Sequence, residues 1–167
     1  MSHGIQSIVM PLDNDRGFSI EHHLAASPDR VFRAWTEPDQ LSWFGNPDAD
    51  HPTSVDLRVG GEWRIYLVQP DGERYWTGGT YREIVPDERI SFAWGVAEGW
   101  PELDPARPDD NPVLTVTLAA APSGGTAQTV RVGFPETMAE HDVQQWLQIG
   151  IEAGWTDTVD RLVRHLE

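Results

Sequence analysis

Apolar residues recur at intervals of three or four positions along residues 137–167. They are Val143, Leu147, Ile151, Trp155, Val159, Leu162 and Leu166. This period predicts a helix that buries one face and exposes the other. Thr137 and Glu140 have the spacing of a capping box at its start. Gly150 and Gly154 interrupt the pattern, which indicates a break between a short and a long helix, close packing, or room left for a ligand.

A period of two residues marks the first strand. Its inward-facing positions are Phe18, Ile20, His22 and Leu24. His22 therefore shares a face with apolar side chains. Ser27-Pro28 then opens a helix, because serine is a favoured N-cap and proline is well tolerated in the first turn. Apolar residues within 31–35 and 41–44 predict two short helices in series.

Short alternations of apolar and polar residues, separated by turn formers, follow these helices. They occupy 54–57, 63–68, 74–85, 90–94, 114–118 and 130–134. Pro70-Asp71-Gly72, Pro86-Asp87-Glu88 and Ser123-Gly124-Gly125 join neighbouring segments tightly, so the strands are predicted to run antiparallel. Gly78-Gly79 predicts a bulge or a sharp bend that curls the sheet.

Together these elements predict an α+β fold. A curved antiparallel sheet of about six to seven strands wraps around the C-terminal helix, and two short helices follow the first strand. We expect residues 1–15 to form an N-terminal tail or a weak edge strand, and residues 16–167 to form a single domain. The wedge between sheet and helix is the natural place for a ligand.

Composition narrows the range of partners. The chain of 167 residues carries a net charge of −15, which would repel nucleic acid and anionic membranes. It has no cysteine, so disulfides and thiol catalysis are excluded. No leader or long apolar segment is evident, and we expect a cytoplasmic protein. No metal-ligand, nucleophile or phosphate-binding motif occurs, so we expect no metal and no cofactor, and no catalytic residue is identified.

Eight tryptophans make aromatic rings the most informative candidates for a site. Such rings fill cores and also line apolar pockets, and composition does not separate the two uses. The candidate ligand contacts, taken from strand and helix phase, are His22, Trp63, Ile65, Trp76, Tyr81, Phe92, Trp94, Val116, Val132, Ile151 and Trp155. A buried imidazole at His22 would orient a ligand, shuttle a proton, or simply be a hydrogen-bonded core residue.

Several segments resemble one known superfamily. They are F-S-I-E-H-H-L-A-A-S-P-D-R-V-F-R-A-W-T-E-P-D-Q-L-S-W-F (18–44), V-G-G-E-W-R-I (59–65), D-G through G-G-T-Y-R-E-I-V-P-D-E-R-I-S-F-A-W (71–94), G-G-T (124–126) and G-W-T-D-T-V-D-R-L (154–162). In this order they resemble the SRPBCC, or START/birch-pollen-allergen-like, helix-grip superfamily, and within it the homologues of the activator of the heat-shock-protein-ninety ATPase. The resemblance implies a curved sheet around a C-terminal helix, an internal apolar cavity and often a homodimer.

Three functions are compatible with these patterns. The one we expect is binding of an apolar or aromatic small molecule in a cavity between the sheet and the C-terminal helix. The family resemblance implies an alternative, a stress-response or chaperone-assisting protein that contacts a protein partner through its acidic surface and the proline-containing loop 97–112. The third is a cavity enzyme, of cyclase, hydratase or hydrolase type, with His22 or a tyrosine as acid or base.

Overall fold

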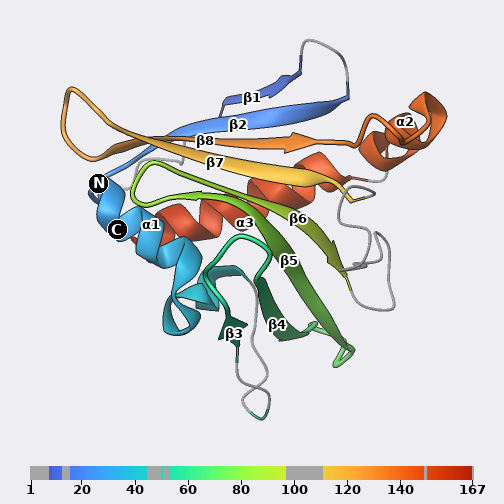
Figure 1. The fold of residues 1–167 in the computed structure, drawn as a ribbon, viewed down its shortest axis with the longest axis horizontal. Coiled ribbons are helices and arrows are strands. Elements are labelled where there is room, and N and C mark those ends of the chain that lie inside the picture. Colours follow the sequence, from blue (N-terminus) through green and yellow to red (C-terminus); the bar gives the residue numbers. More distant parts are fainter. Residues whose placement is uncertain are drawn as a thin grey trace.

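The computed structural model describes residues 8–12, 16–44, 50, 53–96, 111–148 and 150–166. These residues form one sheet of eight strands in the order β1-β2-β8-β7-β6-β5-β4-β3 (Figure 1). The strands are β1 (Ile8–Pro11), β2 (Gly17–Leu24), β3 (Ser54–Val55), β4 (Glu62–Val68), β5 (Arg74–Val85), β6 (Arg89–Val96), β7 (Val113–Ala120) and β8 (Thr126–Gly133). Every neighbouring pair is antiparallel, as the tight turns predict.

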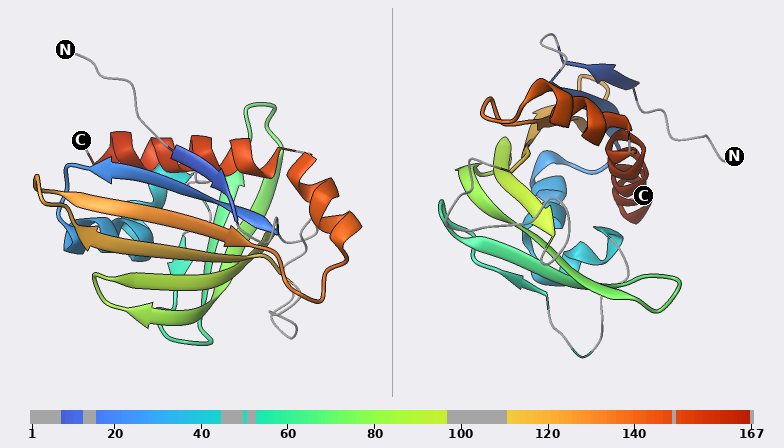
Figure 2. Two further views of the ribbon diagram at one scale, coloured as in Figure 1. Left: turned by 90° about the horizontal axis from the view of Figure 1, so that it is seen from above. Right: turned by 90° about the vertical axis from the view of Figure 1, so that its right-hand side faces the viewer.

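Helical segments accompany this sheet. They are α1 (Pro28–Thr36), the 3₁₀ helix η1 (Pro38–Phe44), α2 (Glu140–Gln148) and α3 (Ile151–His165). The sheet curls around α3, which runs along its concave side (Figure 2). The predicted α+β helix-grip fold is therefore confirmed. Eight strands replace the expected six or seven because Ile8–Pro11 pairs with β2 as the additional edge strand β1, whereas β3 falls within the short strand expected at 54–57.

The C-terminal helical segment is divided in two. Gly150 separates α2 from α3 and has a left-handed backbone with a φ of 97°, a conformation that glycine adopts at the lowest cost. The break predicted from the glycines is therefore present, and it falls at Gly150. The capping-box prediction for Thr137 is wrong, because α2 begins only at Glu140 and residues 136–138 still belong to a turn and bend.

Alternate residues of the strands face α3 and form the core. In β4, Trp63, Ile65 and Leu67 are each at most 4% exposed, whereas their neighbours along the strand are only partly buried. From α3, Trp155 and Val159 pack into the same cluster. Burying such a side chain contributes about 1.5–3 kcal/mol to the free energy of unfolding. This burial selects the strand register, because a shift by one residue would exchange the two faces of a strand.

The irregularity of β5 differs from its prediction. Pairing is regular at Gly78-Gly79, so the bulge expected there is absent. The register shifts instead between Tyr81 and Glu83, which leaves Arg82 as the extra residue. Gly79 has a packing role, since a Cβ on it would lie 2.6 Å from Trp63 Nε1. Gly79 therefore admits a core ring, Gly78 admits the backbone of β4, and neither marks the bulge.

Candidate functional site

A groove opens between α3 and the β4–β5 hairpin on the concave side of the sheet. Two adjoining hollows, of about 220 and 390 Å³, share Phe44, Tyr75 and Arg161. The smaller hollow is also lined by Thr77, Trp94, Ile151, Gly154, Trp155 and Thr158. The larger is also lined by Leu67, Val68, Gln69 and Pro70. Together they form the hairpin groove, whose combined size is within the range typical of small-molecule sites.

Gly154 leaves one wall of the hairpin groove open. It lies inside α3, where its N–H donates to Gly150 O at 2.9 Å. A Cβ built on Gly154 would meet no heavy atom within 4 Å. A glycine inside a helix costs about 1 kcal/mol relative to alanine. Of the alternatives that the sequence raises for this glycine, the structure therefore shows open space and not close packing.

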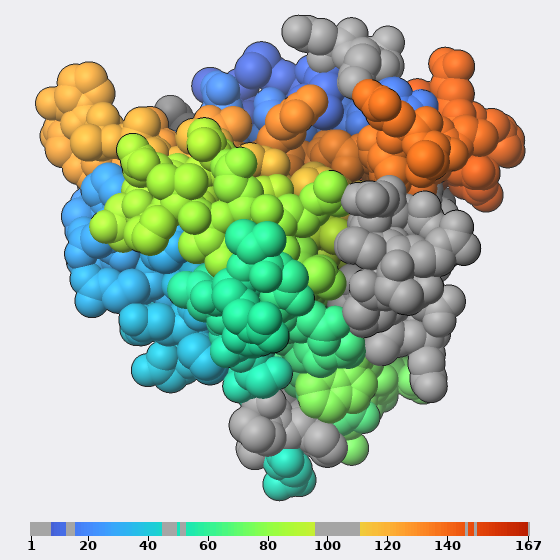
Figure 3. Space-filling model, in the orientation of Figure 1, coloured from blue at the N-terminus to red at the C-terminus, as the bar shows by residue number. Residues whose placement is uncertain are grey.

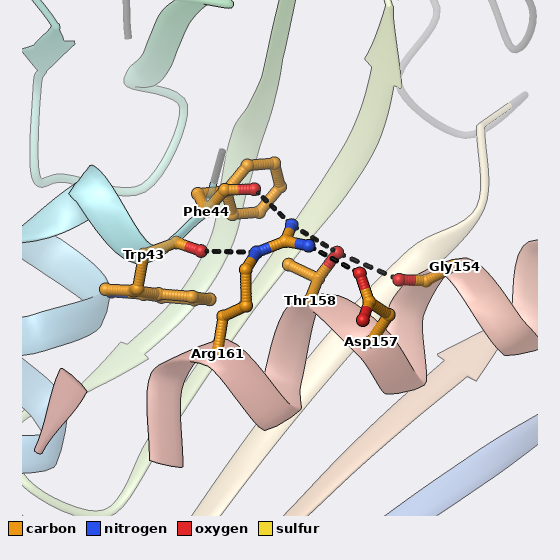
Figure 4. Close-up of polar contacts among 6 residues, drawn as sticks. All are labelled: Trp43, Phe44, Gly154, Asp157, Thr158 and Arg161. Carbon is orange, nitrogen blue, oxygen red and sulfur yellow. Dashed lines mark hydrogen bonds and ion pairs between the residues drawn. The ribbon is translucent and has the colours of Figure 1, made fainter. Parts of the chain in front are cut away.

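The Arg161 guanidinium joins α3 to the end of η1 (Figure 4). Its Nε donates to Trp43 O at 3.0 Å and its Nη2 donates to Phe44 O at 2.8 Å. Carbonyls at a helix end lack helical partners, so Arg161 satisfies two of them. Nη1 also donates to Asp157 Oδ2 at 2.5 Å, and Nη2 lies 3.2 Å from Thr158 Oγ1. These contacts hold the guanidinium in one orientation at the boundary between the two hollows.

A continuous set of aromatic rings runs from the core to the hairpin groove. The pairs are Trp35–Trp43, Trp43–Phe44, Phe44–Trp63, Phe44–Trp155, Trp63–Phe92 and Trp94–Trp155, with centroids 4.9, 5.6, 5.3, 5.5, 5.2 and 5.2 Å apart. Tilted and edge-to-face pairs of this kind contribute about 0.5–1.5 kcal/mol beyond burial of the rings. Trp63 and Phe92 are core rings, whereas Trp94 and Trp155 also line the groove. The tryptophans therefore serve both of the uses that composition leaves open.

Polar atoms beside these rings are mostly engaged within the protein. Thr77 Oγ1 donates to Gly95 O and accepts from Trp94 Nε1, both at 3.0 Å. Tyr75 differs, because no described residue forms a hydrogen bond with its hydroxyl. Burial raises the pKa of Tyr75, and the opposing effect of the Arg161 charge is smaller. A ligand in the groove would thus contact aromatic ring faces and the neutral hydroxyl of Tyr75.

His22 belongs to a buried polar chain and does not line the hairpin groove. Trp35 Nε1 donates to Gln128 Oε1 at 2.9 Å, and Gln128 Nε2 lies 2.8 Å from His22 Nε2. Because an indole N–H only donates, the amide NH₂ of Gln128 faces His22, whose Nε2 accepts and whose Nδ1 carries the proton. Burial lowers the pKa of His22 to about 4, against the opposing charge of Asp160. His22 is therefore a neutral, hydrogen-bonded core residue at neutral pH.

Part of the predicted contact set comes together in the groove. Trp94, Ile151 and Trp155 line it. The predicted residues that lie in the core and do not line the groove are Trp63, Ile65, Tyr81, Phe92, Val116 and Val132. Trp76 is on the outer face of the sheet, opposite Tyr66, with ring centroids 4.7 Å apart. The inward phase assigned to Trp76 is therefore wrong.

Phe44, Tyr75 and Arg161 are groove residues that the sequence patterns do not single out. A signal for Tyr75 exists in the hairpin, because the tight turn pairs Leu67 with Tyr75 and so directs Tyr75, not Trp76, inward. Phe44 is simply the last apolar residue of a short helix. Arg161 falls on the polar side of the predicted helix, where charge indicates solvent exposure.

Other kinds of site can be checked only over the described ranges. There, no three His, Asp or Glu side chains lie close enough together to hold a metal ion. No helix in the same ranges has the length and hydropathy needed to cross a bilayer. Residues 97–110 of the acidic loop lie outside the described part, so the protein contact expected of loop 97–112 stays a prediction.

The fold recurs in solved structures. A protein from Arthrobacter aurescens has a TM-score of 0.76 and 22% identity, with 95% of this chain and 90% of the other covered. Protein Ms6760 from Mycobacterium smegmatis has a TM-score of 0.74 and 22% identity, with 98% of each chain covered. An AHSA1-like protein from Aeromonas hydrophila has a TM-score of 0.63 and 25% identity, with 89% and 90% covered. The architecture is shared over nearly the whole chain.

The family follows from a match over most of the sequence. No curated protein matches the chain significantly. The family model described as activator of Hsp90 ATPase homolog 1-like protein matches residues 25–167. This range includes both walls of the hairpin groove and agrees with the resemblance of segments 18–44 and 154–162. The chain therefore belongs to the family of activator of Hsp90 ATPase homolog 1-like proteins.

Proposed function

We propose that this protein binds an apolar or aromatic small molecule in the hairpin groove. One observation carries the proposal. The rings of Trp94 and Trp155, with centroids 5.2 Å apart, wall a hollow that Gly154 leaves open beside α3. The position between the sheet and the terminal helix is the one expected from the helix-grip resemblance.

The chemistry of the groove favours a ligand with an apolar body. Thr77 and Arg161 already form hydrogen bonds within the protein, so a strongly polar ligand would have to displace them. Apolar surface gains roughly 25 cal/mol per Å² on leaving water. The Tyr75 hydroxyl offers one directional contact. We infer a ligand that covers Trp94, extends toward Pro70 and carries one or two hydrogen-bonding groups.

Titration of the full chain with the neutral fluorophore N-phenylnaphthylamine tests this proposal. Saturable quenching of tryptophan emission, with enhancement of the probe's emission, is expected because the groove is walled by two tryptophans. Gly154→Leu should abolish the saturable phase by filling the hollow. Ala153→Leu adds a similar bulk at the exposed neighbouring position and should leave it unchanged. No saturable response of the unsubstituted chain, or equal responses of the two variants, would overturn the proposal.

A chaperone-assisting role is the second candidate. It is favoured by the family match, since the family takes its description from an activator of the Hsp90 ATPase. A net charge of −15 would favour a basic surface on the partner. Addition of the full chain should then raise the steady-state ATPase rate of Hsp90, and an unchanged rate would remove this candidate. The homodimer implied by the resemblance is tested separately by light scattering.

The cavity-enzyme alternative gains no support from the groove. It needs His22 or a tyrosine to act as acid or base on a bound molecule. His22 does not line the groove, and burial lowers its pKa to about 4. Burial raises the pKa of Tyr81, which does not line the groove, far above its ordinary value, and it also raises the pKa of Tyr75, which does, so neither hydroxyl ionises readily to act as a base. We therefore propose binding and not catalysis for this site.

A further inference from the structure

A third hollow, of about 500 Å³, lies on the outer face of the sheet, which points away from α3. Val113, Thr115 and Arg131 lie on its floor, at strand positions that alternate with core residues. Residues just before β2 and just after β8 form its rim. Figure 3 shows this face, with β5 and β6 in green tones and β7 and β8 in yellow to orange. This hollow is the outer-face pocket.

Arginine dominates the charge of the outer-face pocket. Among the described residues that line it, Arg16, Arg82 and Arg131 are positive and Glu136 is negative, a formal charge of +2. The whole chain has 12 basic and 27 acidic residues and a net charge of −15. The described lining of the pocket is therefore net positive, whereas the chain as a whole is net negative. A concave site of one sign concentrates small ions of the opposite sign.

A row of polar side chains crosses the outer face from strand to strand. Arg131, Thr115 and Arg82 in this row line the pocket, whereas Ser91 is buried beside it. Arg131 in β8 is directly opposite Thr115 in β7, whose hydroxyl lies 3.4 Å from Ser91 Oγ in β6. Arg82 is the extra residue of the bulge in β5, next to the position paired with Ser91. The row thus has an arginine at each end and two hydroxyls between. Three inter-strand spacings separate the backbones of its ends by about 14 Å.

Arg16 organises the rim of the outer-face pocket. Its Nη2 donates to Pro135 O at 2.5 Å and to Met138 O at 2.7 Å. These bonds tie the segment after β8 to the residue that precedes β2. A rim held in place before binding loses little conformational freedom when a ligand enters.

We propose that the outer-face pocket binds a small molecule with two or more oxyanion groups, phosphate or carboxylate, one beside Arg82 and one beside Arg131. Guanidinium groups bind such oxyanions through paired N–H donors. The hydroxyl of Thr115, which lines the pocket, can exchange its long bond to Ser91 Oγ for one to a ligand oxygen between the two ends. The pocket lies on the opposite face of the sheet from the hairpin groove, so this inference does not depend on the function proposed for the groove.

The ligand is a small molecule rather than a nucleic acid. A volume of about 500 Å³ is within the range of small-molecule sites. A small anion is influenced mainly by the local charge of +2, because salt screens charges beyond about 10 Å. Nucleic acid would cover a larger surface and would meet the repulsion of a chain with a net charge of −15.

Isothermal titration of the full chain with pyrophosphate, citrate and inorganic phosphate tests the inference. Pyrophosphate and citrate should bind saturably to one site. Inorganic phosphate should bind at least tenfold more weakly, because it reaches only one end of the row. Arg131→Gln should weaken pyrophosphate binding at least tenfold. Arg30→Gln removes the same charge from an exposed position on α1 and should leave binding nearly unchanged.

Each other outcome overturns part or all of the inference. Absence of saturable binding by pyrophosphate and citrate would remove the site. Equal weakening in Arg131→Gln and Arg30→Gln would show general electrostatic attraction and no built pocket. Equal affinities for phosphate and pyrophosphate would remove the requirement for two oxyanion groups. Circular dichroism checks that each variant is folded. If Arg131→Gln does not fold, Arg131→Lys replaces it in the test. Because Arg131→Lys keeps the charge and loses the paired donors, it should also weaken pyrophosphate binding.

Discussion

Replacing Gly154 with alanine should stabilise the protein. The residue lies inside α3, and its N–H donates to Gly150 O at 2.9 Å. A Cβ at this position would meet no heavy atom within 4 Å, so no steric cost opposes the change. Alanine is favoured over glycine in a helix interior by about 0.8–1.0 kcal/mol. A gain of that size should raise Tm by roughly 2–4 °C in a domain of this length.

Gly150 supplies a matched control for this substitution. A Cβ at Gly150 would also meet no heavy atom within 4 Å, so the two positions differ chiefly in backbone conformation. With a φ of 97°, Gly150 is in the left-handed region, which costs about 1–2 kcal/mol for residues that carry a Cβ. The reduced entropy of the unfolded chain offsets part of this cost. Gly150→Ala should therefore lower the free energy of unfolding by about 1 kcal/mol.

Urea denaturation followed by circular dichroism measures both changes, and a constant m-value would show that the surface exposed on unfolding is unchanged. We expect opposite signs. A loss of stability in Gly154→Ala would show that another group packs against this turn of α3, and the open wall of the groove would then not exist. A gain in Gly150→Ala would show that the left-handed break is absent. The expected result would mean that glycine at position 154 costs stability, as is common where a residue serves binding.

Three further changes test other parts of the structure. Arg161→Gln should lower the free energy of unfolding by about 2 kcal/mol, because two η1 carbonyls lose charged hydrogen bonds; a loss in urea denaturation no larger than that of Arg30→Gln would contradict this. Burial lowers the pKa of His22 to about 4, so as pH falls the imidazole is protonated in the unfolded chain before it is protonated in the folded one. The contribution of His22 to the free energy of unfolding is therefore complete above about pH 6.5 and decreases by about 3 kcal/mol toward pH 4. His22→Gln should remove that decrease, and superimposable stability–pH curves for the two proteins would refute the neutral buried state. Trp94→Ala should weaken N-phenylnaphthylamine binding roughly tenfold in a fluorescence titration, whereas Trp76→Ala should leave it unchanged; equal losses would place the probe elsewhere.

Local periodicity was sufficient to predict the fold. Spacings of three or four residues in 137–167, and of two residues in the strands, assign each side chain to one face of its own element. Burying those faces together leaves few arrangements of a meander and a terminal helix. Ile65, Val116 and Val132 have the inward positions that their strand phase predicts, and they are almost fully buried. Of the two glycines in 137–167, Gly150 produced the predicted break because its backbone is in the left-handed region, whereas Gly154 is helical within α3.

The groove was predictable only in part. Trp94, Ile151 and Trp155 lie on inward faces, so the sequence identified them. Choosing between Tyr75 and Trp76 required the pairing of β5 with β4, because both neighbours are aromatic and alternation alone does not define their phase. The register of the hairpin decided that Tyr75 faces α3.

Tertiary structure alone brought the cationic groups to their sites. Arg161 occupies a polar position of its helix, and nothing near it in sequence indicates that the carbonyls ending η1 become its partners. Arg82 and Arg131 are outward residues of two strands that are not neighbours in the sheet, and they line one pocket only after the strands between them have paired. A sequence pattern records how side chains are distributed around the axis of one element. Distances between elements arise from the packing of the whole chain. The sequence by itself therefore determined the sheet and helix layers, whereas the tertiary structure decided the hairpin groove between the layers and the outer-face pocket on the sheet.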